Sequence, residues 1–447
     1  MRNKIIILSC LLLLSSRAGF SQDESGLRKP ELLLDMIDTS KQMGKDLLSL
    51  QTRLGKLSFS GYMQPQFQYA AEKGTKTFNG GDFAEESQNR FMLRRARLKT
   101  MFSHHLSDGR PSAYIVFQFD GTERGVRTRD FWGRYYENKW ELFSLSAGIM
   151  ARPFGFEVQN SSSSRESPER GRMSQILMKS ERDIGALLSF NPRKKDSKAK
   201  WLHIDLGLFN GQGLEGSGDF DSKKDLVGRI AAQSLKLSKS GIELNFGFSA
   251  LIGGLAYPTD KRLIFEHVGQ SVRLVTDARE GYFGKIAPRN YFGTDGQLII
   301  PGRRFGAVLR AEYIFGHQTA YQFDSQTPGQ YAVNQWGAVQ PFITRPFDGA
   351  YFYYLQNIFS DKHQLVFKYD WYDPNKLVSK NQINPILDFT SADLRYDTWG
   401  AGYIYYINPY VKLVLYYEHP VNEKSELGGF KQDVRDDVMT CRLQFMF

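Results

Sequence analysis

The feature that most constrains this chain is an alternation of apolar and polar residues with a period of two. In residues 58–70, for example, Phe59 and Phe67 lie on one face and Gln64 and Gln66 on the other. Such alternation predicts a β-strand with one apolar and one wet face. Sixteen such segments follow one another along the chain, at 58–70, 90–104, 112–121, 127–137, 140–150, 183–191, 200–210, 225–237, 241–253, 289–300, 304–316, 348–359, 363–373, 394–407, 410–419 and 435–447.

The connections between these segments are predicted to alternate strictly between long and short. A sandwich has no reason to gather its long loops at one end. A transmembrane β-barrel does, because its periplasmic turns are brief and its extracellular loops are extended. We therefore predict an all-β fold, a 16-stranded antiparallel transmembrane β-barrel with both ends of the barrel chain in the periplasm. The long connections are 71–89, 151–182, 254–288, 317–347, 374–393 and 420–434.

Three regions are predicted along the chain. Residues 1–21 have a positive start, an apolar stretch and small residues before the expected cleavage site, which is typical of a secretory signal peptide. Residues 22–57 are predicted to contain a periplasmic helix, because apolar residues recur at spacings of three and four from Leu33 to Leu57. This helix could form a coiled coil or pack on its own domain. Residues 58–447 then form the barrel.

Composition supports an exported β protein. The chain has 33 Phe, 23 Tyr and 41 Gly but only 16 Pro, and one of its two cysteines lies in the predicted leader, so disulfide bonds cannot be its framework. Removing the three cations of residues 1–21 from 58 basic and 48 acidic groups leaves a net charge of +7. That charge is too modest, in an exported chain, to indicate a nucleic-acid partner. A large secreted β domain is the alternative to a barrel, but the terminal Phe447 is typical of outer-membrane barrel strands.

Cations concentrate on one face of the second predicted strand. Arg95, Arg97 and Lys99 share that face, and Leu98 with Met92, Ala96, Thr100 and Phe102 makes the opposite, lipid-compatible face. We expect the three cations to line a water-filled lumen, where their potential concentrates anions. Arg94 is predicted to lie on the lipid side, near the outer rim.

The same alternation points other charged residues inward. The cations are Arg134, Arg229, Arg310 and Lys368, and the acids are Asp120, Asp130, Asp205, Glu312, Asp370 and Glu418. Because both signs are present, these residues could instead pair across the wall, as Arg310 could with Glu312.

The connection at about 151–182 is far longer than its neighbouring strands require. It could fold inside the barrel and constrict it, or remain an exposed loop. Its serine run, Ser161–Ser164, could share contacts with oxyanions. Its charged residues nearly balance, with Arg152, Arg165, Arg170, Arg172, Lys179 and Arg182 against Glu157, Glu166, Glu169, Glu181 and Asp183.

Four stretches resemble one known family. RRARLK at 94–99, the strand pair at 112–137, MARPFGFE at 150–157 and SERDIGALLSFNP at 180–192 are similar to the phosphate-selective porin O and P family of Gram-negative outer membranes. The resemblance implies a trimeric sixteen-stranded barrel, a constricting third loop and an arginine-lined path for phosphate or polyphosphate. It assigns Arg95 and Arg97 to the cationic strand motif, and Arg182 and Asp183 to the junction at the end of the loop.

The sequence also departs from that family. Relatives often carry Lys, Glu and Pro where this chain has Arg152 and Pro153, and a dense run of lysines is missing from the loop. The prediction of a pore is unaffected by these differences, but the argument that the pore selects phosphate is weaker.

The function predicted is passive, anion-favouring diffusion of small oxyanions across the cell outer membrane. We expect small anions, outer-membrane lipid, lipopolysaccharide and two further copies of the chain as partners, and neither a cofactor, a metal nor nucleic acid. A general or sugar-selective porin is the alternative, with Trp132, Tyr136, Tyr372 and Tyr406 facing inward. A purely structural or adhesive barrel is a further alternative, but it would have no use for a charged, water-compatible lumen. An enzyme is not expected, because no nucleophile and acid accompany His203, His363 and His419, and His104 and His105 point to opposite faces.

Overall fold

A computed structural model describes residues 57–214, 216, 218–269 and 271–447. The predicted signal peptide and heptad helix lie outside the described residues, except for Leu57, and stay predictions. The strands are β1 (Leu57–Ala70), β2 (Asn89–His105), β3 (Pro111–Thr122), β4 (Gly125–Tyr136), β5 (Phe143–Ala151), β6 (Arg182–Phe190), β7 (Leu202–Phe209), β8 (Asp225–Lys236), β9 (Glu243–Ala256), β10 (Arg262–Val268), β11 (Ser271–Asp277), β12 (Ile286–Ile300), β13 (Ala307–Ala320), β14 (Ile343–Ile358), β15 (Ser360–Asp373), β16 (Tyr396–Asn408), β17 (Val411–Asn422) and β18 (Val438–Met446). The helices are α3 (Arg172–Leu177), η2 (Lys380–Gln382), η3 (Pro385–Leu387) and η4 (Ser391–Asp393).

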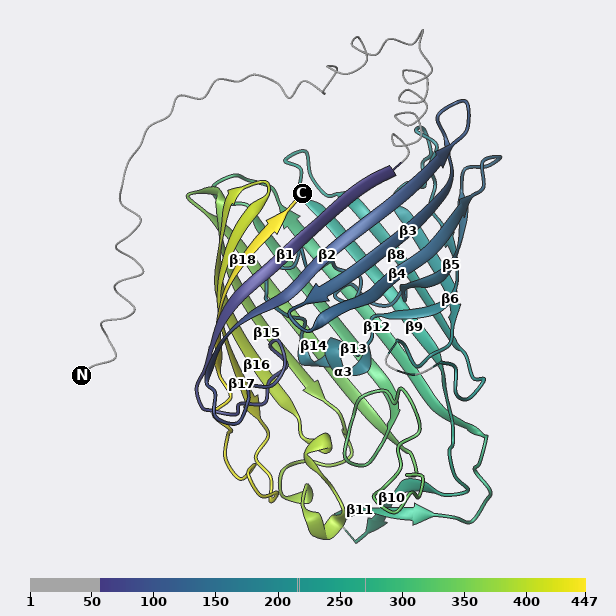
Figure 1. The fold of residues 1–447 in the computed structure, drawn as a ribbon, viewed down its shortest axis with the longest axis vertical. Coiled ribbons are helices and arrows are strands. Elements are labelled where there is room, and N and C mark those ends of the chain that lie inside the picture. The colour runs from purple at the N-terminus through teal and green to yellow at the C-terminus, as the bar shows by residue number, and fades with distance from the viewer. Residues whose placement is uncertain (1–56, 215, 217, 270) are drawn as a thin grey trace, which may run out of the picture. The chain divides into compact units, whose positions relative to one another are not determined.

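Sixteen of these strands close into one antiparallel barrel (Figure 1). Each wall strand pairs with the next along the chain, β9 pairs with β12, and β18 closes the wall by pairing with β1, where Phe67 lies opposite Cys441. Because the wall is closed, its strands form their backbone hydrogen bonds with one another and leave no free sheet edge. This is the condition for placing strands in lipid. The predicted 16-stranded barrel is confirmed.

Each wall strand overlaps one of the sixteen predicted segments. The largest difference in a strand start is at β14, which begins at Ile343 rather than at 348. The β10–β11 hairpin was not predicted, because its two short strands lie within a connection that reads as one long loop. The hairpin joins the barrel through a single parallel bridge between Leu263 and Ile343.

Long connections gather at one end of the barrel, and the C-terminus lies at the other (Figure 1). The prediction of strict alternation is wrong at two places. The β3–β4 connection, at the long-loop end, is residues 123–124 alone, and the β6–β7 connection, at the short-turn end, spans 191–201. The short β3–β4 hairpin leaves residues 125–130 of β4 without a pairing partner on β5, whose pairing with β4 starts at Phe131.

The outer face of the barrel carries exposed apolar side chains. Ile230 and Phe248 are 52% and 59% exposed, and Phe117, Leu206 and Leu208 continue the same outward pattern. Buried polar residues alternate with them, such as Gln64, Gln66 and Gln68 of β1. This is the arrangement that a wall between lipid and a wet interior needs. Among the described residues, no helix is both long enough and apolar enough to cross a membrane.

The 152–181 connection packs against inward-facing residues of the wall, and its helix α3 is seen within the barrel (Figure 1). Its buried Phe154 and Met173 belong to one apolar cluster with Tyr291 of β12 and Phe347 of β14. A second buried cluster joins β14 to β17, including Tyr351, Val366, Ile404 and Val414. The first cluster also includes Met150 of β5, Phe209 of β7 and Leu251 of β9, so apolar side chains pack inside the wall along β5–β9 as well as along β12–β17.

Candidate functional site

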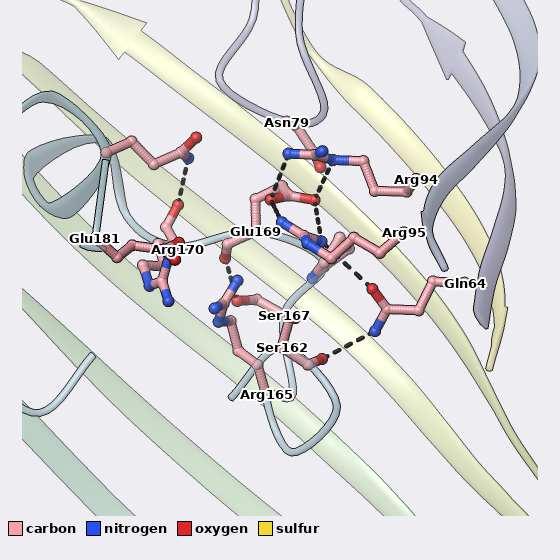
Figure 2. A network of polar contacts seen from close by, with 12 residues as sticks. Gln64, Asn79, Arg94, Arg95, Ser162, Arg165, Ser167, Glu169, Arg170 and Glu181 are labelled. Carbon is pink, nitrogen blue, oxygen red and sulfur yellow. Dashed lines mark hydrogen bonds and ion pairs between the residues drawn. The ribbon is translucent and has the colours of Figure 1, made fainter. Parts of the chain in front are cut away.

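One carboxylate of the 152–181 loop is bound by three arginines of the wall (Figure 2). Glu169 accepts hydrogen bonds from Arg94 Nε at 2.8 Å, from Arg95 Nη2 at 2.5 Å and from Arg442 Nη2 at 3.0 Å. Its side chain is only 3% exposed. Charge-assisted pairs of this kind are the strong ones among protein hydrogen bonds, so Glu169 holds the middle of the loop against β2 and β18.

A β-bulge places both Arg94 and Arg95 on the inner side of β2. The register of β1 and β2 shifts between Met63 and Pro65, so two residues of β2 stand opposite one residue of β1. The extra residue inverts the alternation on one side of the bulge. The prediction of a lipid-side Arg94 is therefore wrong, and so is that of a lipid-side Met92, whose Sδ lies 3.2 Å from the inward Gln66 amide.

A second carboxylate ties the loop to β13. Glu166 binds Arg310 at 2.9 Å, and Glu312 accepts the backbone N–H groups of Phe156 and Glu157 at 3.2 and 3.0 Å. The pairing of Arg310 with Glu312 that the sequence suggested is thus replaced by contacts from both residues to the loop. The reason is that the loop brings in carboxylates and N–H groups that strand alternation cannot show.

A third cluster of charges stands where the loop joins β6. Glu181 contacts the guanidinium groups of Arg129 and Arg170, and Arg182 Nη1 lies 2.6 Å from it. Arg182 also binds Asp130 at 3.0 Å. This cluster bridges the loop to residues 125–130 of β4, which have no partner on β5.

Five further predicted cations lie along the wall. Three have an acid of the wall as partner, and the other two border a cavity described below. The pairs are Arg97 with Asp120 at 3.0 Å, Lys368 with Asp370 at 2.9 Å, and Arg229 with Asp295. Lys99 and Arg134 have no such partner within the described part of the chain.

The remaining predicted cations belong to the loop. Arg152 is buried and donates to the carbonyl of Ser180. Arg165 is 3% exposed and has no carboxylate partner among the described residues. Arg172 is stacked between the rings of Phe78 and Tyr396, and Lys179 borders a cavity.

Other residues of this arrangement were not predicted. Arg442 could have been found, because it falls on the inward face of the last predicted strand. Lys412 could also have been found by alternation along β17; it is 5% exposed and donates to the carbonyls of Ser163 and Arg165 at 2.8 and 3.2 Å. Arg129 could not, because a second bulge, between Gln118 and Phe119 in the β3–β4 register, adds it to the strand.

Three cavities border these charges. The mouth cavity, about 900 Å³, lies among the long loops and includes Arg94, Arg172 and Asp436. The turn-end cavity, about 550 Å³, has Trp132 on its wall, and its charged lining is Arg97, Lys99, Arg134 and Arg182 against Asp130. The side cavity, about 490 Å³, is bordered by Asp120, Arg127, Arg129, Lys179, Glu181 and Arg182. The turn-end and side cavities thus meet at Arg182, whereas the mouth and turn-end cavities share no lining residue.

The described residues show no group of three or more His, Cys, Asp or Glu side chains arranged to hold a metal ion. The geometry offers guanidinium, ammonium, hydroxyl and backbone N–H donors. Such a donor set can replace part of the water around an oxyanion.

No family model and no curated protein matches the chain. Among solved structures, the outer membrane channel DcaP of Acinetobacter baumannii is similar with a TM-score of 0.51 and 10% identity, covering 88% of this chain and 97% of that one. OmpT of Vibrio cholerae with loop L8 deleted, an outer membrane protein, has a TM-score of 0.47 and 8% identity over 88% and 99%. A mutant of the Rh. blastica porin has 0.44 and 9% over 88% and 100%. The likeness to the DcaP channel shows that the two chains share a barrel fold of the outer-membrane channel type.

Proposed function

We propose that the protein is an outer-membrane porin through which small anions, and oxyanions such as phosphate or polyphosphate above all, diffuse passively. The barrel fold, its apolar outer belt and its charged interior support a transmembrane channel. The preference for anions is supported by the turn-end cavity, whose charged lining comprises four cations and one acid. A cavity with one dominant sign of charge raises the local concentration of the opposite ion.

The predicted site residues contribute in two ways under this proposal. Lys99 and Arg134 offer charge directly to the turn-end cavity, and Lys179 does so in the side cavity. Arg95, which binds Glu169, instead positions the loop that narrows the path. The loop itself, residues 152–181, is proposed as the constriction, because its anchored acids hold it across the interior.

Phosphate fits this interior better than chloride does for a geometric reason. A planar guanidinium presents two N–H donors that can meet two oxygens of one oxyanion, which a spherical halide cannot use. Several weak sites in series would allow passage, since a single strong site would retain the ion.

Planar-bilayer recording tests the proposal. In a KCl gradient, the reversal potential of the purified full chain is expected to lie toward the chloride equilibrium potential, and added phosphate is expected to reduce the chloride current. A reversal potential on the potassium side would reject the anion preference.

A general or sugar-selective porin is the second candidate. Trp132 borders the turn-end cavity, with the Arg134 guanidinium 5.0 Å from its ring centre, and five cations face four acids around the mouth cavity. Swelling of liposomes in maltodextrin solutions distinguishes the two functions, because rapid swelling is expected only for the sugar pathway.

The regions outside the described residues complete the proposal. Residues 1–21 would direct export and be removed, and the helix within 22–57 would lie in the periplasm and join three copies through a coiled coil. Chemical cross-linking of the full chain and of a chain lacking residues 22–56, both inserted in membranes, would test that role.

A further inference from the structure

We propose that Glu169 is a built-in competitor of the permeating anion: its carboxylate closes the connection between the mouth cavity and the turn-end cavity, and an oxyanion that passes must take its place on the arginines. This inference rests on the proposed porin function and deepens it. It concerns one loop residue rather than the wall cations that attract the ion.

The position of Glu169 carries the first step. Of its three partners, Arg94 borders the mouth cavity, whereas Arg95 and Arg442 border neither the mouth nor the turn-end cavity. Beyond Arg95, Gln64 donates to the carbonyl of Ser162 at 2.9 Å (Figure 2). The Ser162 hydroxyl in turn lies 2.6 Å from Tyr62, which borders the turn-end cavity. A continuous chain of contacts centred on Glu169 therefore stands between the two cavities.

The charge of the surroundings carries the second step. Six cations, Arg94, Arg95, Arg165, Arg310, Lys412 and Arg442, contact this part of the loop or its neighbours. The acids paired with them are Glu166 and Glu169, and buried Glu157 adds a third negative charge close to Arg165. Five of the six cations are less than 9% exposed. Buried charge without a counter-charge is costly, so the network favours additional negative charge.

The third step is that phosphate is a stronger ligand for the arginines than the Glu169 carboxylate is. A carboxylate brings one negative charge, whereas hydrogen phosphate brings two and has oxygens enough for several guanidinium groups. In the free channel Glu169 satisfies the arginines and keeps water and small monovalent ions from a strong site. An arriving phosphate displaces the Glu169 carboxylate, which is the weaker ligand of the arginines. As the phosphate moves on, the carboxylate returns to the arginines, and this exchange prevents the site from retaining the ion.

Substitution of Glu169 tests this role. In Glu169→Gln the side chain keeps its shape and loses its charge, so the chloride conductance is expected to rise. The phosphate concentration that halves the chloride current is expected to fall by about tenfold, because the arginines lose their internal ligand. Glu169→Asp keeps the charge and withdraws it by one methylene, and we expect a change in the same direction that is smaller.

The matched control is Glu86→Gln. Glu86 has a side chain 89% exposed and pairs with Lys73 on the β1–β2 loop, so this variant removes the same charge away from the network. It is expected to keep the wild-type conductance and the wild-type half-blocking concentration.

Wild-type values of both quantities in Glu169→Gln and Glu169→Asp would overturn the inference, as would equal shifts in Glu86→Gln. The porin proposal would survive either result provided that the wild-type channel prefers anions. A wild-type channel that prefers potassium would instead reject the proposed function itself.

Discussion

The single residues that matter most are carboxylates of loops, because each meets arginines that other parts of the chain supply. Glu166, Glu169 and Glu181 all lie on the 152–181 loop and all bind wall or loop arginines. Removing one partner of a buried pair commonly costs about 3–5 kcal/mol, because the other charge stays buried without compensation. The position of the loop therefore depends on a few acids rather than on its many basic residues.

At the same scale, Asp436 of the β17–β18 loop is predicted to make the channel pH-dependent. Burial raises the pKa of Asp436 to about 7; Arg172 lowers it, and the neighbouring Asp433 raises it. Because folding raises this pKa, the folded state binds the proton more tightly than the unfolded state does. This binding stabilises the fold at low pH, and the stabilisation is lost as the pH rises from about 4 toward 7. Below about pH 7 the mouth cavity also loses a negative charge, so anion preference is expected to increase.

Reversal potentials in a KCl gradient between pH 5 and 8.5 check this prediction. The wild type is expected to show a step near pH 7, and Asp436→Asn is expected to remain at the low-pH value throughout. A variant with the same step as the wild type would show that another group titrates.

At the scale of elements, two β-bulges increase the number of inward cations. The bulge in β2 adds Arg94 beside Arg95, and the bulge in β4 adds Arg129 beside Asp130. A bulge adds one residue to a strand, so that two consecutive side chains can face the same side of the sheet. Both added arginines bind acids of the 152–181 loop, so strand irregularity and loop anchoring belong together.

Deletions in β2 test the role of its bulge. Deleting Arg94 leaves a regular ladder, so the barrel is expected to fold with one inward cation fewer. Deleting Leu98 instead shifts Arg95 and Arg97 to the lipid face, where an arginine costs about 2–4 kcal/mol near the bilayer centre. Folding is measured as the fraction with the fast, heat-modifiable mobility of a closed barrel on unboiled gels; equal fractions for both deletions would contradict the prediction.

At the scale of the whole molecule, consecutive residues of a wall strand face opposite environments, lipid on one side and a wet interior on the other. Phe117 of β3 is 44% exposed on the outer face, and its neighbour Gln118 borders the turn-end cavity. Phe117→Arg is expected to lower the free energy of unfolding by about 2–4 kcal/mol, whereas Gln118→Arg is expected to change it little. Guanidinium unfolding in liposomes checks the pair, and equal losses would place both residues on the same side of the wall.

The interior of the whole molecule is asymmetric. Apolar residues of the 152–181 loop form one cluster with residues of β5–β9 and β12–β15, and a further apolar cluster joins β14 to β17. The turn-end cavity, by contrast, is lined mainly by β1–β5. The path proposed for anions therefore runs beside the strands that carry RRARLK.

The sequence by itself determined the barrel. A period of two is a local property of a strand, and the sixteen segments, their order and most of their inward faces follow from it. It also located Arg95, Arg97 and the long loop. Strict alternation failed at the bulges, because one added residue changes the face of its neighbours without any mark in the composition.

Only the tertiary structure decided which charges meet. Arg442 and Glu169 are 273 residues apart in sequence and 3.0 Å apart in space. No spacing rule joins them, because their contact depends on a loop that crosses the interior of the closed wall. The pattern of side chains along a strand is a local matter, whereas the partner of a charge inside a closed barrel is set by the chain as a whole.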